Sequence, residues 1–269
     1  MSMAQINVGR RKVQVYEAGN GDPILYLHGV ADMHGAAEGP FAFHQALAAS
    51  GKVIAPAHPG CVGTDEDDTL ETIDDLVFHT LEVMDALDLD RPTVIGNSIG
   101  GWLAAEIAAR NPERVGKLVL IGATGVFVEN EPIGDLFMAV QPRNGGIADL
   151  RSMLFAEGES QLAQELFPDW PDEKAQGMRR YQVFRFSSRI GFKPPYFYHA
   201  KLRHRLHRFL GPTLILWGSE DRFVPSAHAA AYGASLSGSR IEVIDGAGHA
   251  VILEQASIVA QKISDFLIS

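Results

Sequence analysis

The sequence predicts an α/β fold: a mostly parallel sheet with helices on both faces. Short apolar runs bounded by Gly and Pro alternate with segments of helical periodicity, which is typical of strand–helix–strand units. A G-x-S-x-G turn follows one of these apolar runs, at residues 96–100. One long stretch, 125–210, contains no convincing strand and interrupts the alternation.

Eight strands are expected. The N-terminal runs 4–9 and 12–18 alternate between apolar and polar residues and predict a hairpin. Six further short runs, bounded by Gly and Pro, are interpreted as buried strands, as expected where helices cover a sheet on both faces. They are residues 23–29, 52–57, 93–97, 117–123, 213–218 and 240–245.

Three helices are clear from periodicity and composition. Residues 71–88 place apolar side chains at three- and four-residue spacing on one face. Residues 99–110 are rich in small side chains and stop at Asn111-Pro112, and residues 255–268 form a closing helix.

The stretch 125–210 predicts a helical cap domain inserted into a core domain formed by residues 1–124 and 211–269. It has several Pro and Gly residues and short helical patterns. Ligands of open α/β sheets bind at the carboxyl ends of the strands. An insertion that follows the strand at 117–123 reaches that edge, so we expect the cap to cover a site there.

Composition excludes several functions. The chain has 269 residues, 46% of them hydrophobic, and a formal net charge of −10. The chain is too apolar for a disordered protein, and its acidic net charge argues against binding to nucleic acid or to an anionic membrane. No apolar run has the length of a membrane span, the N-terminus lacks a secretory signal, and Cys61 stands alone. We expect a cytoplasmic monomer or homodimer.

Ser98 is the expected nucleophile. It lies in Gly96-Asn97-Ser98-Ile99-Gly100, after an apolar strand and before a small-residue helix. This is the context that a nucleophile elbow requires, because the strained turn presses strand and helix together and leaves room only for glycine on either side. An ordinary glycine-rich turn is the alternative.

A serine hydroxyl needs a base, and the base needs an acid that holds its tautomer. His249 follows the last predicted strand, and Asp221 follows the strand before it. The chain order Ser, acid, His agrees with this assignment. Glu220 is the alternative acid, and loop residues without a catalytic role are the alternative for all three.

The developing oxyanion needs two fixed donors. We expect these to be the backbone N–H groups of Ile99 and Val30, which lies in the loop after the strand at 23–29. His28, at the end of that strand, is expected to brace the loop through hydrogen bonds rather than to take part in chemistry.

These residues resemble the α/β-hydrolase superfamily over essentially the whole chain. The motifs occur in family order: His28-Gly29, the turn at 58–63, GNSIGG at 96–101, WGSEDRFVP at 217–225 and GAGHAVILE at 246–254. The resemblance implies a Ser98–Asp221–His249 triad, a helical cap, a small-molecule substrate and no cofactor. One departure is Ala57-His58, where relatives often have Asp at the start of the turn.

Within the superfamily, Ser at the elbow disfavours the branches that attack through a carboxylate. We expect hydrolysis of a small carboxylic ester or lactone. The alternative is C–C bond hydrolysis, because GNSIGG and DRFVP are similar to the meta-cleavage-product hydrolases. Ala250 replaces the Trp usual in those enzymes, and the loop at 28–32 has less Gly and Pro. A ligand-binding receptor on the same scaffold is an alternative from another class.

The predicted cap divides by charge. Residues 129–173 carry ten acids and two basic residues, whereas 174–208 carry ten basic residues and no acid. One hypothesis is that a cation in this part binds a substrate carboxylate. The candidates are Arg185, Arg189, Lys193 and Arg203. The alternative is that these charges pair with other charges and with solvent. His199, His204 and His207 lack carboxylate or Cys companions, so no metal site is expected.

Overall fold

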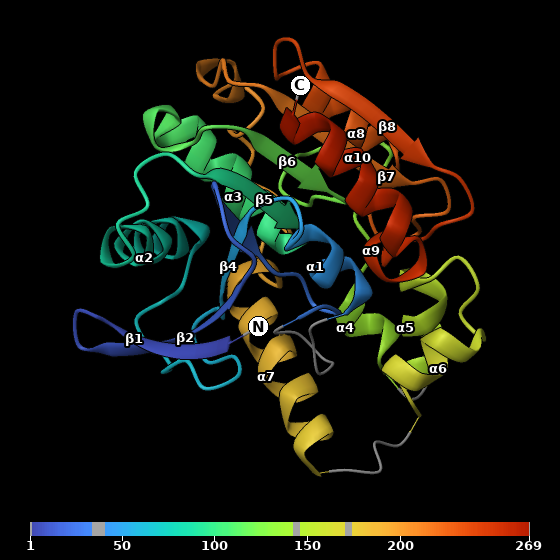
Figure 1. The fold of residues 1–269 in the computed structure, drawn as a ribbon. Helices are drawn as coiled ribbons and strands as arrows, with labels where there is room; N and C mark the ends of the chain where they lie inside the picture. The colour runs from blue at the N-terminus through green and yellow to red at the C-terminus, as the bar shows by residue number, and fades with distance from the viewer. Residues whose placement is uncertain (1, 34–40, 142–145, 170–173, 269) are drawn as a thin grey trace.

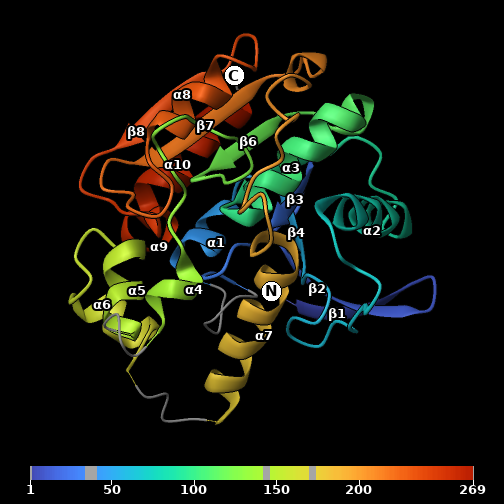
Figure 2. The same ribbon diagram turned by 180° about the vertical axis from the view of Figure 1, so that it is seen from behind.

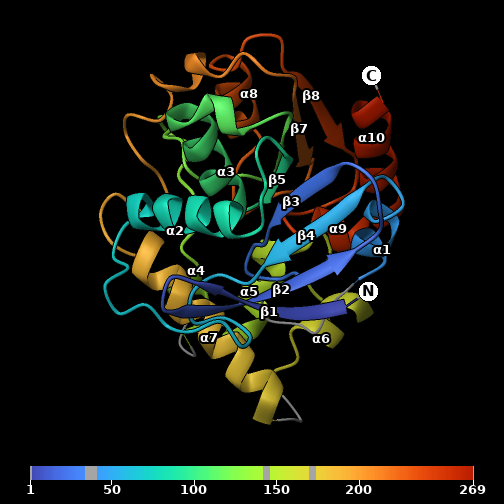
Figure 3. The same ribbon diagram turned by 60° about the vertical axis from the view of Figure 1, so that its left-hand side comes forward.

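The computed structural model describes residues 2–33, 41–141, 146–169 and 174–268. Its centre is one eight-stranded sheet of order β1-β2-β4-β3-β5-β6-β7-β8 (Figure 3). The strands are β1 (Ser2–Val8), β2 (Arg11–Ala18), β3 (Pro23–Leu27), β4 (Lys52–Pro56), β5 (Thr93–Asn97), β6 (Leu118–Ile121), β7 (Thr213–Gly218) and β8 (Arg240–Ile244).

The sheet is antiparallel only at its N-terminal edge. β1 pairs with β2 and β2 with β4 in antiparallel register, and every pair from β4 to β8 is parallel. The predicted eight-stranded, mostly parallel sheet is therefore confirmed. Because the strands from β3 to β8 run in the same direction, the loops that follow β3, β5, β7 and β8 meet at one edge.

Helices cover both faces of the sheet, as Figures 1 and 2 show from opposite sides. One face carries α2 (Ile73–Ala86), α3 (Ile99–Arg110) and α8 (Ala227–Gly233). The other carries α1 (Ala42–Leu47), α9 (Val251–Glu254) and α10 (Ala256–Ile268). Each face has its own cluster of buried apolar side chains. The sequence did not predict α1 or α8, which are only six and seven residues long.

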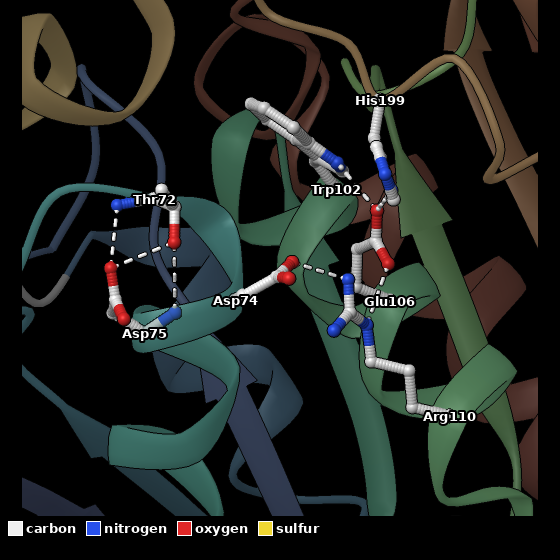
Figure 4. A network of polar contacts seen from close by, with 7 residues as sticks. All are labelled: Thr72, Asp74, Asp75, Trp102, Glu106, Arg110 and His199. Atoms are coloured by element: carbon white, nitrogen blue, oxygen red, sulfur yellow. Dashed lines mark hydrogen bonds and ion pairs between the residues drawn. The ribbon is translucent and has the colours of Figure 1, made fainter.

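The start of α2 is two residues later than expected, and its N-cap explains the difference. Thr72 Oγ1 accepts a hydrogen bond from the Asp75 N–H at 3.3 Å, while Asp75 Oδ2 accepts one from the Thr72 N–H at 2.8 Å (Figure 4). This reciprocal capping box satisfies donors that have no partner inside the helix. Hydrogen bonds from Thr72 also lower the pKa of Asp75 below its usual value.

The segment 125–210 contains helices and no named strand among its described residues. Four of these helices lie together at one end of the molecule in Figures 1 and 2. They are α4 (Leu136–Ala139), α5 (Ile147–Leu154), α6 (Gln161–Leu166) and α7 (Lys174–Gly191). We expected only short helical patterns here, but α7 has 18 residues. Val183, Phe186 and Ile190 are buried at helical spacing and hold it on the core.

Within the described part of the chain, no helix combines the length and apolar character that crossing a membrane requires.

Candidate active site

Ser98 lies at a sharp turn between β5 and α3. Its backbone has φ 57° and ψ −118°, a strained conformation for a residue with a side chain. A Cβ on Gly96 would lie 2.2 Å from the Gly100 carbonyl oxygen, and one on Gly100 would lie 2.1 Å from the Leu27 carbonyl oxygen. The expected strain and the need for glycine on both sides are therefore confirmed by the geometry.

The three predicted side chains are joined by hydrogen bonds. Ser98 Oγ lies 2.9 Å from His249 Nε2, and His249 Nδ1 lies 2.8 Å from Asp221 Oδ2. All three residues are buried. Since the Asp221 carboxylate accepts at Nδ1, that nitrogen carries the proton and Nε2 is free to accept the Ser98 proton.

Asp221 is itself held in place by its loop. Its Oδ1 accepts the N–H groups of Phe223 at 3.0 Å and Val224 at 2.8 Å, which leaves Oδ2 for His249. Glu220, the alternative acid, instead has a half-exposed side chain beside Arg222 at 3.8 Å. The geometry thus favours Asp221 as the partner of the histidine.

The expected oxyanion donors lie on the two loops that meet at Ser98. A Cβ on Gly29 would be 3.0 Å from Ser98 Cβ, so the backbone before Val30 passes directly beside the serine. Neither the Val30 nor the Ile99 N–H donates to another residue in the described ranges. Two unpaired N–H groups next to a nucleophile are what an oxyanion hole requires.

Two histidines brace the loop after β3. The His58 N–H donates to His28 Nε2 at 3.1 Å, so His28 carries its proton on Nδ1, which lies 2.9 Å from the Gly29 carbonyl oxygen. His58 Nε2 donates to the His28 carbonyl oxygen at 3.0 Å. Phe186 of α7 stacks on the His58 ring at 4.7 Å between centroids. His28 therefore braces the loop as expected, and His58 shares that task.

The loop that carries His249 is tied to the end of α5. Ala250 N–H donates to the Leu154 carbonyl oxygen at 2.7 Å. Glu254 accepts the Ala156 N–H on Oε1 at 2.8 Å and the Gly248 N–H on Oε2 at 2.7 Å. Both chain neighbours of His249 are thus linked to residues 154–156, Ala250 directly and Gly248 through Glu254. Burial raises the pKa of Glu254 above its usual value, although the two N–H groups oppose this.

Arg222, next to Asp221, binds the same end of α5. Its Nη1 donates to the carbonyl oxygens of Ser152, Phe155 and Ala156 at 3.1–3.3 Å. These carbonyls lie at a helix C-terminus, where a cation stabilises groups that have no partner inside the helix. The sequence did not indicate a role for Arg222 or Glu254. Their partners are residues 152–156, and no local sequence pattern shows where this segment packs on the core.

A separate attachment joins the ends of the segment 125–210 to α3 (Figure 4). Glu106 is fully buried and accepts hydrogen bonds from His199 Nδ1 at 2.7 Å, Arg110 Nε at 2.9 Å and Trp102 Nε1 at 3.3 Å. The His199 N–H in turn donates to the Gly125 carbonyl oxygen at 2.9 Å. These contacts with His199 and Arg110 hold the pKa of Glu106 below its usual value against the opposing effect of burial.

A groove of about 550 Å³ lies between α4, α5 and α7. Aromatic and aliphatic side chains dominate its lining, with Arg180, Arg185 and Ser188. A series of ring contacts leads from its wall to the histidine: Phe137–Phe192 at 5.7 Å, Phe192–Phe197 at 5.1 Å, Phe197–Phe223 at 5.7 Å and Phe223–His249 at 4.7 Å. The groove and the proposed nucleophile's partner therefore share one aromatic wall.

Arg180 is the cation of this groove that sequence reasoning missed. It is 9% exposed and forms no ion pair with any described residue. Its two terminal nitrogens share the Pro168 carbonyl oxygen at 3.3 Å, and Nε has no hydrogen-bond partner in the described part of the chain. Burial and the nearby Arg151 lower the pKa of Arg180. The repeated arginines of α7 gave no sign of which one was buried.

The cations proposed from the sequence are placed differently. Arg185 pairs with Glu66, and Arg189 donates to Asp68 Oδ1 at 3.0 Å and to the Asp67 carbonyl oxygen at 2.8 Å. These contacts tie α7 to the acidic turn, in agreement with the alternative that charges pair with charges. Lys193 and Arg203 are exposed.

Burial keeps two other titratable side chains, Cys61 and His79, in their neutral forms near pH 7. Burial raises the pKa of the Cys61 thiol to about 12 and lowers that of His79 to about 4. Among the residues with described positions, no three His, Cys, Asp or Glu side chains could jointly hold a metal ion. His199 is bound to Glu106, as described above.

Sequence relatives were found over most of the chain. A hydrolase of Pseudomonas putida that is named for 2-hydroxy-6-oxononadienedioate and 2-hydroxy-6-oxononatrienedioate is 32% identical over 80% of this chain and 77% of its own. The 2-hydroxymuconate semialdehyde hydrolase of Pseudomonas sp. strain CF600 is 28% identical over 95% of this chain and 90% of its own.

A solved structure supports the same fold. The meta-cleavage product hydrolase of Pseudomonas fluorescens IP01 superimposes with a TM-score of 0.78, covering 98% of this chain and 96% of its own, at 24% identity. The family model of the alpha/beta hydrolase fold matches residues 22–256. With the elbow at Ser98 and the sheet order described above, the chain belongs to the α/β-hydrolase family.

Proposed function

We propose that this protein is a cofactor-free serine hydrolase in which Ser98, His249 and Asp221 form the catalytic triad. The observation that carries the proposal is the buried hydrogen-bond relay from Ser98 Oγ through the imidazole to Asp221. Val30 and Ile99 supply the two backbone donors for the oxyanion. Residues 125–210 act as a cap over this site, on a core of residues 1–124 and 211–269.

The proposed reaction is hydrolysis of a C–C bond in a 2-hydroxy-6-oxo-dienoate, rather than of an ester or lactone. The names of the relatives support this class: besides those above, a 28% identical relative is a 2-hydroxy-6-oxo-2,4-heptadienoate hydrolase. In the sequence, Ala250 and the loop at 28–32 favour an ester or lactone. Ala250 N–H binds the Leu154 carbonyl oxygen through its backbone, so this contact does not require a Trp side chain.

In the proposed mechanism, the keto tautomer of the substrate presents its 6-oxo carbonyl to Ser98. Ser98 Oγ forms a bond to that carbon as His249 Nε2 takes the hydroxyl proton, and the oxyanion is stabilised by the two backbone N–H groups. The neighbouring C–C bond then breaks. Its electron pair passes into the conjugated oxo group, and His249 returns the proton. Water, activated by the same histidine, releases the carboxylic acid from the acyl-enzyme.

Arg180 is the proposed partner of a substrate carboxylate. It is buried, lines the groove between α4, α5 and α7, and lacks an anionic partner among the described residues. Arg185 and Arg189 are engaged with the acidic turn, and Lys193 is exposed. Arg180→Met should therefore raise KM for an acidic substrate by about tenfold or more, as loss of a charge-assisted contact does. Arg189→Met should change it little.

A substrate panel tests the reaction class. The protein is incubated with 2-hydroxy-6-oxo-2,4-heptadienoate, p-nitrophenyl acetate and a γ-lactone, and the products are separated by chromatography. We expect kcat/KM for the dienoate to exceed that for the ester and the lactone by at least about a hundredfold, since interactions in the transition state decide specificity. A higher kcat/KM for the ester or lactone would contradict the proposal.

A ligand-binding receptor on the same scaffold makes the opposite prediction for a reactive probe. A fluorophosphonate should label Ser98 rapidly and with one equivalent if the relay activates the hydroxyl. Absence of labelling, with retained dienoate binding, would favour the receptor. The cytoplasmic location and the monomeric or homodimeric state stay predictions from the sequence.

A further inference from the structure

Asp32 occupies the loop that carries Val30, and it is fully buried. Three donors converge on its carboxyl group. The Gly29 N–H donates to Oδ1 at 2.8 Å, Asn97 Nδ2 donates to Oδ2 at 3.0 Å, and the Tyr26 hydroxyl donates to the same Oδ2. Asp32 takes no part in the Ser98–His249–Asp221 relay, so its buried acceptor needs another explanation.

The groups bound to Asp32 are the chain neighbours of the proposed oxyanion hole. Gly29 directly precedes Val30, and Asn97 directly precedes Ser98. One carboxyl group therefore joins the loop after β3 to the loop after β5. These loops carry the two proposed N–H donors, and they touch where a Cβ on Gly29 would lie 3.0 Å from Ser98 Cβ.

We infer that Asp32 is a positioning residue that sets the separation of the Val30 and Ile99 N–H groups, and so the geometry of the oxyanion hole. This inference rests on the proposed function. It concerns how the two donors are held, and it does not make Asp32 a catalytic residue, because Asp32 touches neither the nucleophile nor its base in the described contacts.

The parallel pairing of β3 with β5 brings the two loops together as far as Leu27 and Gly96, and the contacts of Asp32 continue this link beyond the ends of the strands. Asp32 is the only hydrogen-bond partner of the Asn97 amide within the described residues, since Asn97 Oδ1 has none. Burial and the neighbouring Asp32 raise the pKa of Tyr26 well above its usual value, so Tyr26 keeps its proton and donates. The carboxyl group thus acts as a fixed acceptor for three donors, two at the end of β3 and its loop and one at the end of β5.

The expected consequence is specific to the transition state. Negative charge forms on the carbonyl oxygen only during the reaction, so a misplaced donor slows turnover without weakening substrate binding. Removal of one oxyanion donor costs about a hundredfold to a thousandfold in kcat, and displacement of a donor should cost less. Loss of the Asp32 contacts should therefore lower kcat by about tenfold to a hundredfold.

The principal experiment is the variant Asp32→Asn, assayed with 2-hydroxy-6-oxo-2,4-heptadienoate. The new amide can accept the Gly29 N–H, but it presents a donor to Asn97 Nδ2. We expect kcat to fall by about tenfold or more while KM stays within about twofold of the parent value. A kcat within about twofold of the parent, in a folded variant, would overturn the inference.

A second readout separates positioning from a merely structural role. Phenylboronic acid accepts the Ser98 Oγ lone pair on boron, the serine proton passes to His249, and one boronate oxygen takes the place of the oxyanion. The inhibition constant for this compound should rise in Asp32→Asn by about as much as kcat falls. An unchanged inhibition constant would contradict the assignment to the oxyanion hole.

Two further variants serve as controls. Tyr26→Phe removes one donor but keeps the link between Gly29 and Asn97, so kcat should stay within about threefold of the parent. The double variant Asp32→Asn/Asn97→Asp exchanges donor and acceptor and should restore kcat to within about fivefold. If Asp32→Asn does not fold, the kcat of the double variant tests the inference instead. A folded double variant whose kcat is lower than that of the parent by about tenfold or more overturns the inference.

Failure of the inference can be distinguished from failure of the proposed function. If fluorophosphonate labels Ser98 and Asp32→Asn turns over normally, Asp32 has no positioning role and the serine hydrolase remains. If Ser98→Ala turns over normally, the proposed function fails and the role of Asp32 fails with it.

Discussion

The helical segment 125–210 is attached to the core in two places that differ in chemistry. At its ends, His199 binds the buried carboxylate of Glu106 on α3. At the end of α5, residues 154–156 bind the loops that carry Asp221 and His249, through backbone groups, Glu254 and Arg222. The first attachment is a buried network of charges, and the second is mostly hydrogen bonds to main-chain groups beside the proposed catalytic residues.

This difference suggests a division of tasks. Among the described residues, the Glu106 side chain contacts no side chain of the proposed triad, so its loss should affect stability more than turnover. Gly248 and Ala250 flank His249 directly, so loss of their partners should displace the imidazole. Small displacements of catalytic groups are costly because the reaction depends on alignment.

The largest effect is expected at the first attachment. Glu106→Ala would leave His199 and Trp102 without their buried acceptor and Arg110 with Asp74 as its remaining ion-pair partner among the described residues. Breaking such a buried network should cost about 3 kcal/mol of unfolding free energy. Urea unfolding followed by circular dichroism measures this loss. For the folded fraction, kcat should stay within about threefold of the parent.

Glu106→Gln is the matched control, because the amide keeps an acceptor oxygen and the shape of the side chain. It should lose less unfolding free energy than Glu106→Ala. Equal losses in the two variants would show that the shape of the side chain, rather than its acceptor, stabilises this attachment.

The second attachment is tested by Glu254→Gln. An amide can accept only one of the Ala156 and Gly248 N–H groups and presents a donor to the other. We expect kcat to fall by about tenfold with a small change in stability. Glu220→Gln, which alters an exposed carboxylate beside the same site, should leave kcat unchanged. A Glu254→Gln variant with parental kcat would remove the distinction between the two attachments.

Acidification should affect the two attachments in a fixed order. The pKa of Glu254 is raised above its usual 4.5, so this carboxylate takes a proton first as pH falls, and the parent then resembles Glu254→Gln. The ratio of parental to variant kcat should approach one below that pKa. The pKa of Glu106 is lowered, so its contribution to stability is present above pH 4.5 and is lost only as pH falls through the lower value.

The smallest effect is expected for Arg222→Ala. Half of the Arg222 side chain is exposed, so solvent weakens its hold on the α5 carbonyl oxygens. A decrease in kcat of about twofold to threefold is expected from steady-state assays, smaller than that of Glu254→Gln. A larger decrease in kcat for Arg222→Ala than for Glu254→Gln would show that the contact of α5 with the Asp221 loop matters more than its contact with the His249 loop.

The sequence predicted the parts of this molecule that depend on local patterns. The strands at 93–97 and 213–218 and the helix at 99–110 match the structure residue for residue. Ser98, Asp221 and His249 could be proposed because each follows a strand in a recognisable motif, and parallel strands bring their carboxyl ends together. The expectation that the last strand is buried was wrong, because β8 lies at the edge of the sheet and most of its residues are exposed. The role of His28 followed from its place at a strand end.

Contacts between distant segments could not be predicted in the same way. Glu106 lies in a small-residue helix, and nothing local indicates that His199 would reach it across more than ninety residues. Arg180 and Arg185 lie five residues apart on one cationic helix. Only the docking of α7 against the turn at 64–68 shows that Arg185 is paired and that Arg180 faces the groove.

Steady-state turnover of 2-hydroxy-6-oxo-2,4-heptadienoate by Ser98→Ala tests the central claim most directly. With Ser235→Ala as a control outside the site, Ser98→Ala should lower kcat by at least about a thousandfold while the protein stays folded. Turnover by Ser98→Ala within about tenfold of the parent would contradict the account, because no acyl-enzyme could then form at this serine.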